Sequence, residues 1–156
     1  MNEFFLFQSV ILADDDAEEH EIFREALLQV APTANLSLVQ SGRELQGRLQ
    51  HFVPDFIFLD LGMPGQDGLQ CLRQIRLDPM MQHVHVVIFS GSAQPMKIAM
   101  AYEMGADLFI VKPDKFQKLV QTLEQIFALD WSHPTTVKEQ YQRQGQYAPG
   151  RQAIRH

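Results

Sequence analysis

Short apolar runs alternate with longer stretches whose apolar residues recur at helical spacing along most of this chain. Short runs of this kind are typical of strands buried on both faces, whereas the longer stretches favour amphipathic helices. Repeated strand–helix pairs predict an α/β domain in which a parallel sheet carries helices on both faces. The expected strands are 9–13, 36–39, 56–59, 84–89 and 108–111, and the expected helices are 17–30, 42–52, 68–77, 95–104 and 114–129.

Polar and helix-breaking residues mark the ends of several expected elements. Asp16 is suited to the N-cap of the first helix, because its carboxylate can accept a hydrogen bond from a free backbone N–H. Pro95 suits the first turn of the fourth helix, Gly105 ends that helix, and Asp114 is the expected cap of the last one. The first strand has an alternative start in the apolar residues 4–7.

The apolar run 56–59 ends at a carboxylate, Asp60, and the chain continues through Met63-Pro64-Gly65. Proline lacks the N–H that a strand interior needs and glycine permits a sharp turn, so the strand ends here. Asp60 is therefore expected at the carboxyl end of a central parallel strand, where open α/β sheets place their ligand crevices. A lone aspartate in this position more often only begins a turn, so the ends of the other strands decide between the two interpretations.

Chemically active side chains follow four of the five expected strands. Because the carboxyl ends of parallel strands share one edge of a sheet, we expect these side chains to lie close together. This grouping favours a functional site over a simple turn at Asp60. The residues are Asp14 and Asp15 after the first strand, Asp60 after the third, Ser90 after the fourth and Lys112 after the fifth.

Carboxylates gathered at one edge need a compensating cation. At a separation of about 4–6 Å each pair repels by roughly 3–4 kcal/mol at an effective dielectric constant of about 20. Mg²⁺ suits such a site, because it prefers oxygen ligands and is often held by one or two carboxylates. Lys112 balances the remaining charge. The expected metal ligands are Asp14, Asp15, Asp60 and the backbone carbonyl of Gly62.

A metal-bound carboxylate beside a lysine and a hydroxyl is suited to accept a phosphoryl group. Asp60 would attack phosphorus as a nucleophile and become an aspartyl phosphate. Mg²⁺ and Lys112 would stabilise the charge on the phosphoryl oxygens, and Ser90 would donate a hydrogen bond to one of them. Gly91 leaves room for the group to enter.

Four segments together resemble the receiver domain of bacterial two-component response regulators. The similarity covers about residues 8–129, and the segments occur in the family's order. The resemblance implies a flavodoxin-like (βα)5 fold, a doubly wound five-stranded parallel sheet with the strand order 2-1-3-4-5. The segments are Val10–Asp16, Asp60–Gly68, Ser90–Ala93 and Gly105–Pro113.

The resemblance also implies a role for each site residue. Asp14 and Asp15 help to hold Mg²⁺, and Asp60 accepts a phosphoryl group from a sensor histidine kinase or a phosphotransfer protein. Ser90 is the switch hydroxyl, and Lys112 is the lysine that faces the phosphoryl group. A cis peptide bond before the following proline, residue 113, is implied as well, in a turn that would aim the lysine inward.

Phe109 lies where the family has its aromatic switch residue, which turns inward when the hydroxyl residue moves toward the phosphoryl group. Ordinary packing in an edge strand fits the sequence equally well, so both interpretations stay open. Gly62 and Ser92 lie at positions that influence the rate of phosphoryl loss in this family. Gly62 has no side chain to position a water molecule, so the lifetime of the phosphoryl group is also left open.

Length and composition limit the wider interpretation. The 156 residues fit one receiver domain, 1–131, followed by a C-terminal tail, 132–156, which has few aliphatic residues in its later part and is expected to be mobile. A net charge of −6 argues against a nucleic-acid surface, and no apolar run is long enough to cross a bilayer. We therefore expect a cytoplasmic protein with no DNA or membrane partner.

The expected function is that of a stand-alone response regulator, a switch with no enzymatic activity beyond self-phosphorylation and self-dephosphorylation. The fourth helix, fifth strand and fifth helix would contact an unknown downstream protein, and homodimerisation through that face stays open. The main alternative is a Mg²⁺-dependent phosphohydrolase with an aspartate nucleophile, but such enzymes commonly carry a second aspartate where this chain has Gly62. A flavodoxin-like cofactor protein is disfavoured by the acids after the first strand, and the intact acidic set disfavours a receiver that works without phosphate.

Overall fold

The central strand, β3 (Phe56–Leu59), has a parallel neighbour on each side. The structure, a computed structural model, describes residues 9–63, 65 and 67–146, and its five strands form one parallel sheet in the order β2-β1-β3-β4-β5. This order confirms the expected flavodoxin-like fold. The other strands are β1 (Ser9–Ala13), β2 (Asn35–Val39), β4 (His85–Ser90) and β5 (Leu108–Val111).

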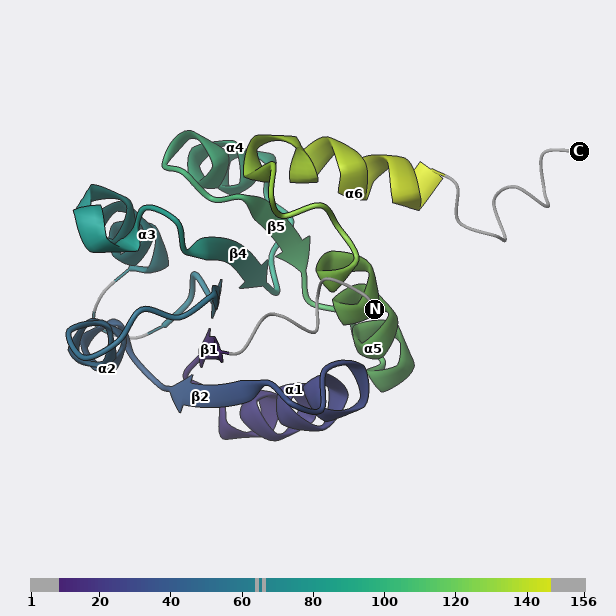
Figure 1. Cartoon of the computed structure of the whole chain (residues 1–156), viewed down its shortest axis with the longest axis horizontal. Helices are drawn as coiled ribbons and strands as arrows, with labels where there is room; N and C mark the ends of the chain where they lie inside the picture. The colour runs from purple at the N-terminus through teal and green to yellow at the C-terminus, as the bar shows by residue number, and fades with distance from the viewer. Residues whose placement is uncertain (1–8, 64, 66, 147–156) are drawn as a thin grey trace, which may run out of the picture.

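Helices cover both faces of the sheet (Figure 1). One face packs against α1 and α5, and the other packs against α2, α3 and α4. A further helix, α6, follows α5 and lies at the β5 end of the sheet. The helices are α1 (Ala17–Val30), α2 (Gly42–Leu49), α3 (Gly68–Leu77), α4 (Pro95–Glu103), α5 (Phe116–Phe127) and α6 (Val137–Gln146), with the 3₁₀ turns η2 (Pro79–Met81) and η3 (Pro134–Thr136).

Successive residues of each buried strand point to opposite faces of the sheet and therefore fill two separate cores. The core beneath α1 and α5 is rich in phenylalanine, and the rings of Phe58 and Phe23 meet edge to face with 5.0 Å between their centroids. The core beneath α2, α3 and α4 is mainly aliphatic and includes the fully buried Ile57 and Leu72. Because β3 lies between the two cores, all four of its residues are apolar and buried.

Within the expected C-terminal tail, 132–156, residues 134–146 form η3 and α6. Trp131 is only 5% exposed, and its indole N–H donates to a backbone carbonyl of α5 at 2.8 Å. Val137 is fully buried, and Tyr141, one helical turn later, packs against the same core. A few large apolar side chains therefore dock a segment that is otherwise polar.

Two smaller expectations near the end of β5 are wrong. The N-cap of α5 is Lys115 instead of Asp114. None of the peptide bonds in the described part of the chain is cis, so the implied cis bond before Pro113 is not found. Lys112 continues directly from β5, and its N–H donates to the carbonyl of Ser90 at 2.7 Å, which already places it at the sheet edge.

Three stretches that bear on the sequence analysis lie outside the described residues. They are the alternative strand start at 4–7, the Pro64 of the turn after β3, and residues 147–156. Among the helices within 9–146 that the structure describes, none is both long enough and apolar enough to cross a membrane.

Candidate functional site

Backbone hydrogen bonds between neighbouring strands place the first and third strand ends side by side. The N–H of Asp60 donates to the carbonyl of Ala13 at 2.9 Å, and the N–H of Asp14 donates to the carbonyl of Val39 at 3.0 Å. Both bonds continue the parallel ladder one residue past the assigned strands. The two aspartates are therefore held at the same edge of the sheet by the backbone itself.

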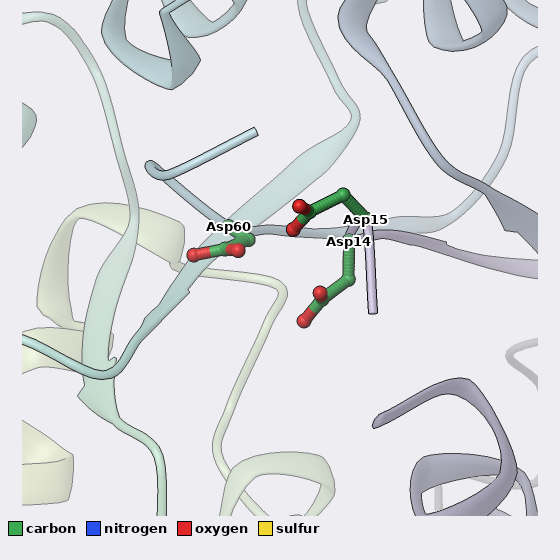
Figure 2. A group of neighbouring side chains, drawn as sticks. All are labelled: Asp14, Asp15 and Asp60. Atoms are coloured by element: carbon green, nitrogen blue, oxygen red, sulfur yellow. The ribbon is translucent and has the colours of Figure 1, made fainter. Parts of the chain in front are cut away.

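The side chains of Asp14, Asp15 and Asp60 gather at this edge, as Figure 2 shows. A carboxylate oxygen of each lies within 4.8 Å of a carboxylate oxygen of the other two. Asp14 is 1% exposed and Asp60 is 9% exposed, whereas Asp15 is open to solvent. The acidic cluster predicted from the strand ends is therefore real, and it combines two buried carboxylates with one at the surface.

Lys112 reaches this cluster from the end of β5. Its Nζ lies 2.7 Å from Oδ2 of Asp14 and 3.7 Å from Oδ2 of Asp60. The other oxygen of Asp14 accepts a hydrogen bond from the N–H of Asp16 at 2.9 Å, so both of its oxygens are bonded. Asp14 is thus fixed in position, while Asp60 makes the longer contact with the ammonium group.

Burial and charge act in opposite directions on the titration of this cluster. Burial raises the pKa of Asp60 above its ordinary value, and the positive charge of Lys112 offsets only part of that rise. Burial by itself would lower the pKa of Lys112, but the hydrogen bond to Asp14 and the charges of both aspartates raise it overall. The lysine therefore stays charged at neutral pH.

The turn after β3 packs closely around Asp60. The N–H of Gly62 donates to Oδ1 of Asp60 at 3.2 Å, and a Cβ at Gly62 would lie 3.9 Å from both carboxylate oxygens. At Gly68, the first residue of α3, a Cβ would lie 2.5 Å from the Cα of Leu61 and 2.7 Å from the carbonyl oxygen of Asp60. Glycine is therefore required at Gly68 for α3 to approach the strand end.

Ser90 lies at the end of β4 and is buried, and its Oγ accepts a hydrogen bond from the N–H of Ser92 at 3.1 Å. Phe109 is buried among the residues beneath α2, α3 and α4, so its ring points inward. The N–H of Phe109 donates to the hydroxyl of Tyr102 at 2.9 Å. The switch roles of Ser90 and Phe109 and the ligand role of the Gly62 carbonyl stay predictions.

Two residues at the start of α1, His20 and Glu19, also belong to the site, although no sequence motif placed them there. A ring nitrogen of His20 lies 2.6 Å from the carbonyl oxygen of Asp14, and the ring is buried. Burial raises the pKa of Glu19, which also experiences the charges of Lys112, Asp14 and Asp60. Asp16 caps the helix as expected, and the first helical turn after a strand end necessarily lies over that end. The position of His20 and Glu19 in this first turn is therefore the sequence feature that indicates their closeness to the site.

The donor chemistry of the cluster fits a hard divalent cation. Carboxylate oxygens are the ligands that Mg²⁺ prefers, and an exposed member such as Asp15 leaves space for the water molecules that this ion retains. Within the described residues, these three aspartates are the only group of three or more His, Cys, Asp and Glu side chains whose ligand atoms lie close enough together to hold a metal ion.

Several known proteins are similar to this chain. The chemotaxis protein CheY of Pseudomonas aeruginosa is 28% identical over 76% of this chain and 94% of its own length. The probable C4-dicarboxylate response regulator DctR of Priestia megaterium is 32% identical over 75% of this chain, but the chain spans only about half the length of that relative, 50%.

Solved structures agree with this similarity. The crystal structure of the phosphorylated cyanobacterial phytochrome response regulator RcpA matches with a TM-score of 0.72 and 26% identity, covering 77% of this chain and 91% of that one. The chemotaxis response regulator CheY4 of Vibrio cholerae has the same fold, with a TM-score of 0.68, 21% identity and coverage of 76% and 98%. The family model described as the response regulator receiver domain matches residues 10–124, which is most of the chain. Both the resemblance in the motifs and the fold are thereby confirmed, and the chain belongs to the response regulator receiver domain family.

Proposed function

We propose that this protein is a phosphorylation switch that accepts a phosphoryl group on Asp60 from the phosphohistidine of a sensor kinase or a phosphotransfer protein. The observation that carries the proposal is the convergence of three carboxylates and one ammonium group at a single strand edge. Asp60 is the suitable nucleophile, because Asp14 is fully bonded by its neighbours and Asp15 is the exposed member.

The proposed transfer forms one bond and breaks another. A carboxylate oxygen of Asp60 forms a bond to phosphorus, while the bond between phosphorus and the donor imidazole nitrogen breaks. The imidazole keeps the electron pair and takes up a proton. Lys112 stands 3.7 Å from the carboxylate of Asp60, within reach of a phosphoryl oxygen attached there, and would stabilise its charge.

Mg²⁺ would be held by Asp14, Asp15 and Asp60, with the carbonyl of Gly62 as a further ligand. The ion supplies positive charge that neutralises the phosphoryl oxygens during transfer. The role of the chain itself is to hold these oxygen donors together. The backbone hydrogen bonds of Asp14 and Asp60 to neighbouring strands fix their positions without an ion.

The signal would leave the site through the side of the molecule formed by α4, β5 and α5. A phosphoryl group adds about −1.5 to −2 charges at neutral pH, which favours a new arrangement of the groups that can bind it. Ser90 and Lys112 are such groups, and they are joined by the hydrogen bond between their main chains. A shift of the ends of β4 and β5 toward Asp60 would then change the surface presented to a downstream protein.

The similarity to proteins described as regulators supports this function. The RcpA structure is described as phosphorylated, and the CheY relative is described as a chemotaxis protein. A phosphohydrolase remains the second candidate, and Gly62 argues against it, because glycine offers no carboxyl group for acid–base catalysis two residues after the nucleophile.

Beryllofluoride, a stable mimic of a phosphoryl group, tests the proposal. Calorimetric titration in the presence of Mg²⁺ should give saturable binding to the natural protein and none to the variant Asp60→Asn. Binding that persists in the variant, or that needs no Mg²⁺, would overturn the proposal. Continuous turnover of an aryl phosphate by the natural protein, lost in Asp60→Asn, would establish the phosphohydrolase instead.

A further inference from the structure

Helix α6 lies beside the open edge of the sheet at β5, the last strand in the sheet order (Figure 1). The helix lies beside both α4 and α5, as its contacts with Tyr102 of α4 and with Thr122 of α5 indicate. These three elements, α4, β5 and α5, form the face that we assign to signalling. The chain thus places a segment of its own on the surface that a downstream protein would use.

The contacts with α5 anchor α6 through apolar packing and one polar contact. Val137 is fully buried and joins the phenylalanine-rich core. Tyr141 packs against the edge of the same core, and its hydroxyl is hydrogen-bonded with that of Thr122. Along this side an open groove is lined by residues that include Val111, Lys112 and Tyr141. The groove connects the end of the strand that carries the lysine with the docked helix.

The contact with α4 connects α6 to the backbone of β5. Nζ of Lys138 lies 4.1 Å from the centroid of the Tyr102 ring, which is the geometry of a cation–π interaction. The hydroxyl of Tyr102 in turn accepts the N–H of Phe109 at 2.9 Å. Tyr102 therefore supports β5 with one end of its side chain and α6 with the other.

The same strand is tied to the phosphorylation site. Phe109 pairs with Ile88 of β4, and Val111 pairs with Ser90. Lys112, the next residue, donates its backbone N–H to Ser90 and its ammonium group to Asp14. A displacement of Ser90 and Lys112 toward Asp60 would consequently move β5 relative to the aromatic side chain on which α6 rests.

We propose that α6 is a tethered cap on the α4–β5–α5 face and that a phosphoryl group on Asp60 weakens its docking, so that the downstream protein competes with α6 for this face. The inference rests on the proposed function, because it takes Asp60 as the phosphorylated residue. It adds that part of the signalling surface is occupied by the chain itself. It also adds that the route from the site to the cap runs through Lys112, β5 and Tyr102.

Hydrogen exchange of the full chain, measured on the peptide that spans 137–146, tests the cap. Beryllofluoride with Mg²⁺ should speed the exchange of α6 by about tenfold, a typical size for coupling between two sites. The variant Asp60→Asn should show no change on the same addition. Unchanged exchange of α6 while beryllofluoride binds would overturn the cap and leave the proposed function intact. A failure of beryllofluoride to bind would overturn both.

Coupling is reciprocal for binding equilibria, so loosening α6 must strengthen binding at the site. We expect Tyr141→Ala to tighten beryllofluoride binding by up to about tenfold and Tyr141→Phe, which loses only the hydroxyl, to tighten it less. Gln142→Ala changes an exposed residue of the same helix and should leave the affinity unchanged. Faster exchange of α6 in Tyr141→Ala without any gain in beryllofluoride affinity would contradict the coupling.

Discussion

The ammonium nitrogen of Lys112 lies a full ångström closer to Oδ2 of Asp14 than to Oδ2 of Asp60, at 2.7 and 3.7 Å. Asp14 thus acts as the anchor of the lysine, and Asp60 keeps the weaker contact. This arrangement holds a positive charge beside Asp60, the proposed nucleophile, mainly through the contact with Asp14. A phosphoryl group on Asp60 can then attract the lysine without first having to break a tight ion pair with Asp60.

Removal of this charge should weaken binding of a phosphoryl mimic. We expect Lys112→Met to lower the affinity for beryllofluoride at least about tenfold, because a preorganised cation near developing or bound charge typically contributes this much or more. Lys97→Met, which removes an exposed lysine of α4, is the matched control and should have no effect. Equal affinities of both variants in a calorimetric titration would show that Lys112 does not face the bound group.

Neutralising the nucleophile should stabilise the protein when no divalent ion is added. Burial raises the pKa of Asp60, so the folded state disfavours the charged carboxylate, and Asp60→Asn should raise the free energy of unfolding at pH 7 because Lys112 keeps its closer partner, Asp14. The gain should shrink as the pH falls through the folded-state pKa, since protonation removes the same charge from Asp60. Urea denaturation at several pH values measures this difference, and a less stable variant at pH 7 would contradict the expectation.

Two glycines should respond in opposite ways to the same substitution. Gly68→Ala forces a Cβ into the backbone of Leu61, so we expect a loss of about 1–3 kcal/mol and weaker beryllofluoride binding as the turn around Asp60 shifts. Gly47→Ala meets nothing within 4 Å inside α2 and should gain about 0.5–1 kcal/mol. Thermal or urea unfolding of both variants checks the pair. Comparable stabilities would show that α3 does not need its close approach to the strand end.

Protonation of His85, whose ring contacts Trp131, should lower the stability of the folded protein at acid pH. Burial, aided by the charge of Arg76, lowers the pKa of His85 from 6.5 to about 4, and its ring centroid lies 4.6 Å from that of Trp131. The unfolded chain therefore binds a proton more tightly than the folded one, and stability falls as the pH drops from about 6.5 to about 4.

The contribution of His85 is measured as the difference in pH dependence between the natural protein and the variant His85→Phe. Relative to His85→Phe, the natural protein should lose on the order of 2 kcal/mol of unfolding free energy between pH 7 and a pH of about 4, while the carboxylates that titrate in both proteins cancel. Chemical denaturation at both pH values gives the comparison. If the unfolding free energies of the two proteins fell by the same amount, the pKa of His85 would not be lowered by folding.

The sheet and most of the site could be predicted from the sequence because they depend on short local signals. Each apolar run became a strand, and the rule that parallel strand ends share an edge was enough to bring Asp14, Asp60 and Lys112 together. The proposed switch roles of Ser90 and Phe109 involve side-chain movements, for which the apolar pattern of the strands carries no signal.

The docking of helix α6 was not predicted, because few residues of the helix signal it. Among the polar residues of α6, Val137 and Tyr141 are one turn apart, and only their position next to the α5 core reveals that they form a docking face. The N-cap of α5 was predicted one residue too early. The choice between Asp114 and Lys115 depends on backbone angles, which two neighbouring polar residues do not determine. The partner of His20 is a backbone carbonyl, so only the position of the first turn of α1 after β1 could have indicated this contact.

The most direct measurement of the central claim is the site of phosphorylation itself. The protein is incubated with Mg²⁺ and acetyl phosphate, a small phosphodonor, and the modified residue is then located by mass spectrometry after borohydride reduction of the acyl phosphate. We expect a single modified residue, Asp60, and no modification when Mg²⁺ is chelated. Modification of another residue at the same level, or none in the presence of Mg²⁺ and donor, would contradict it.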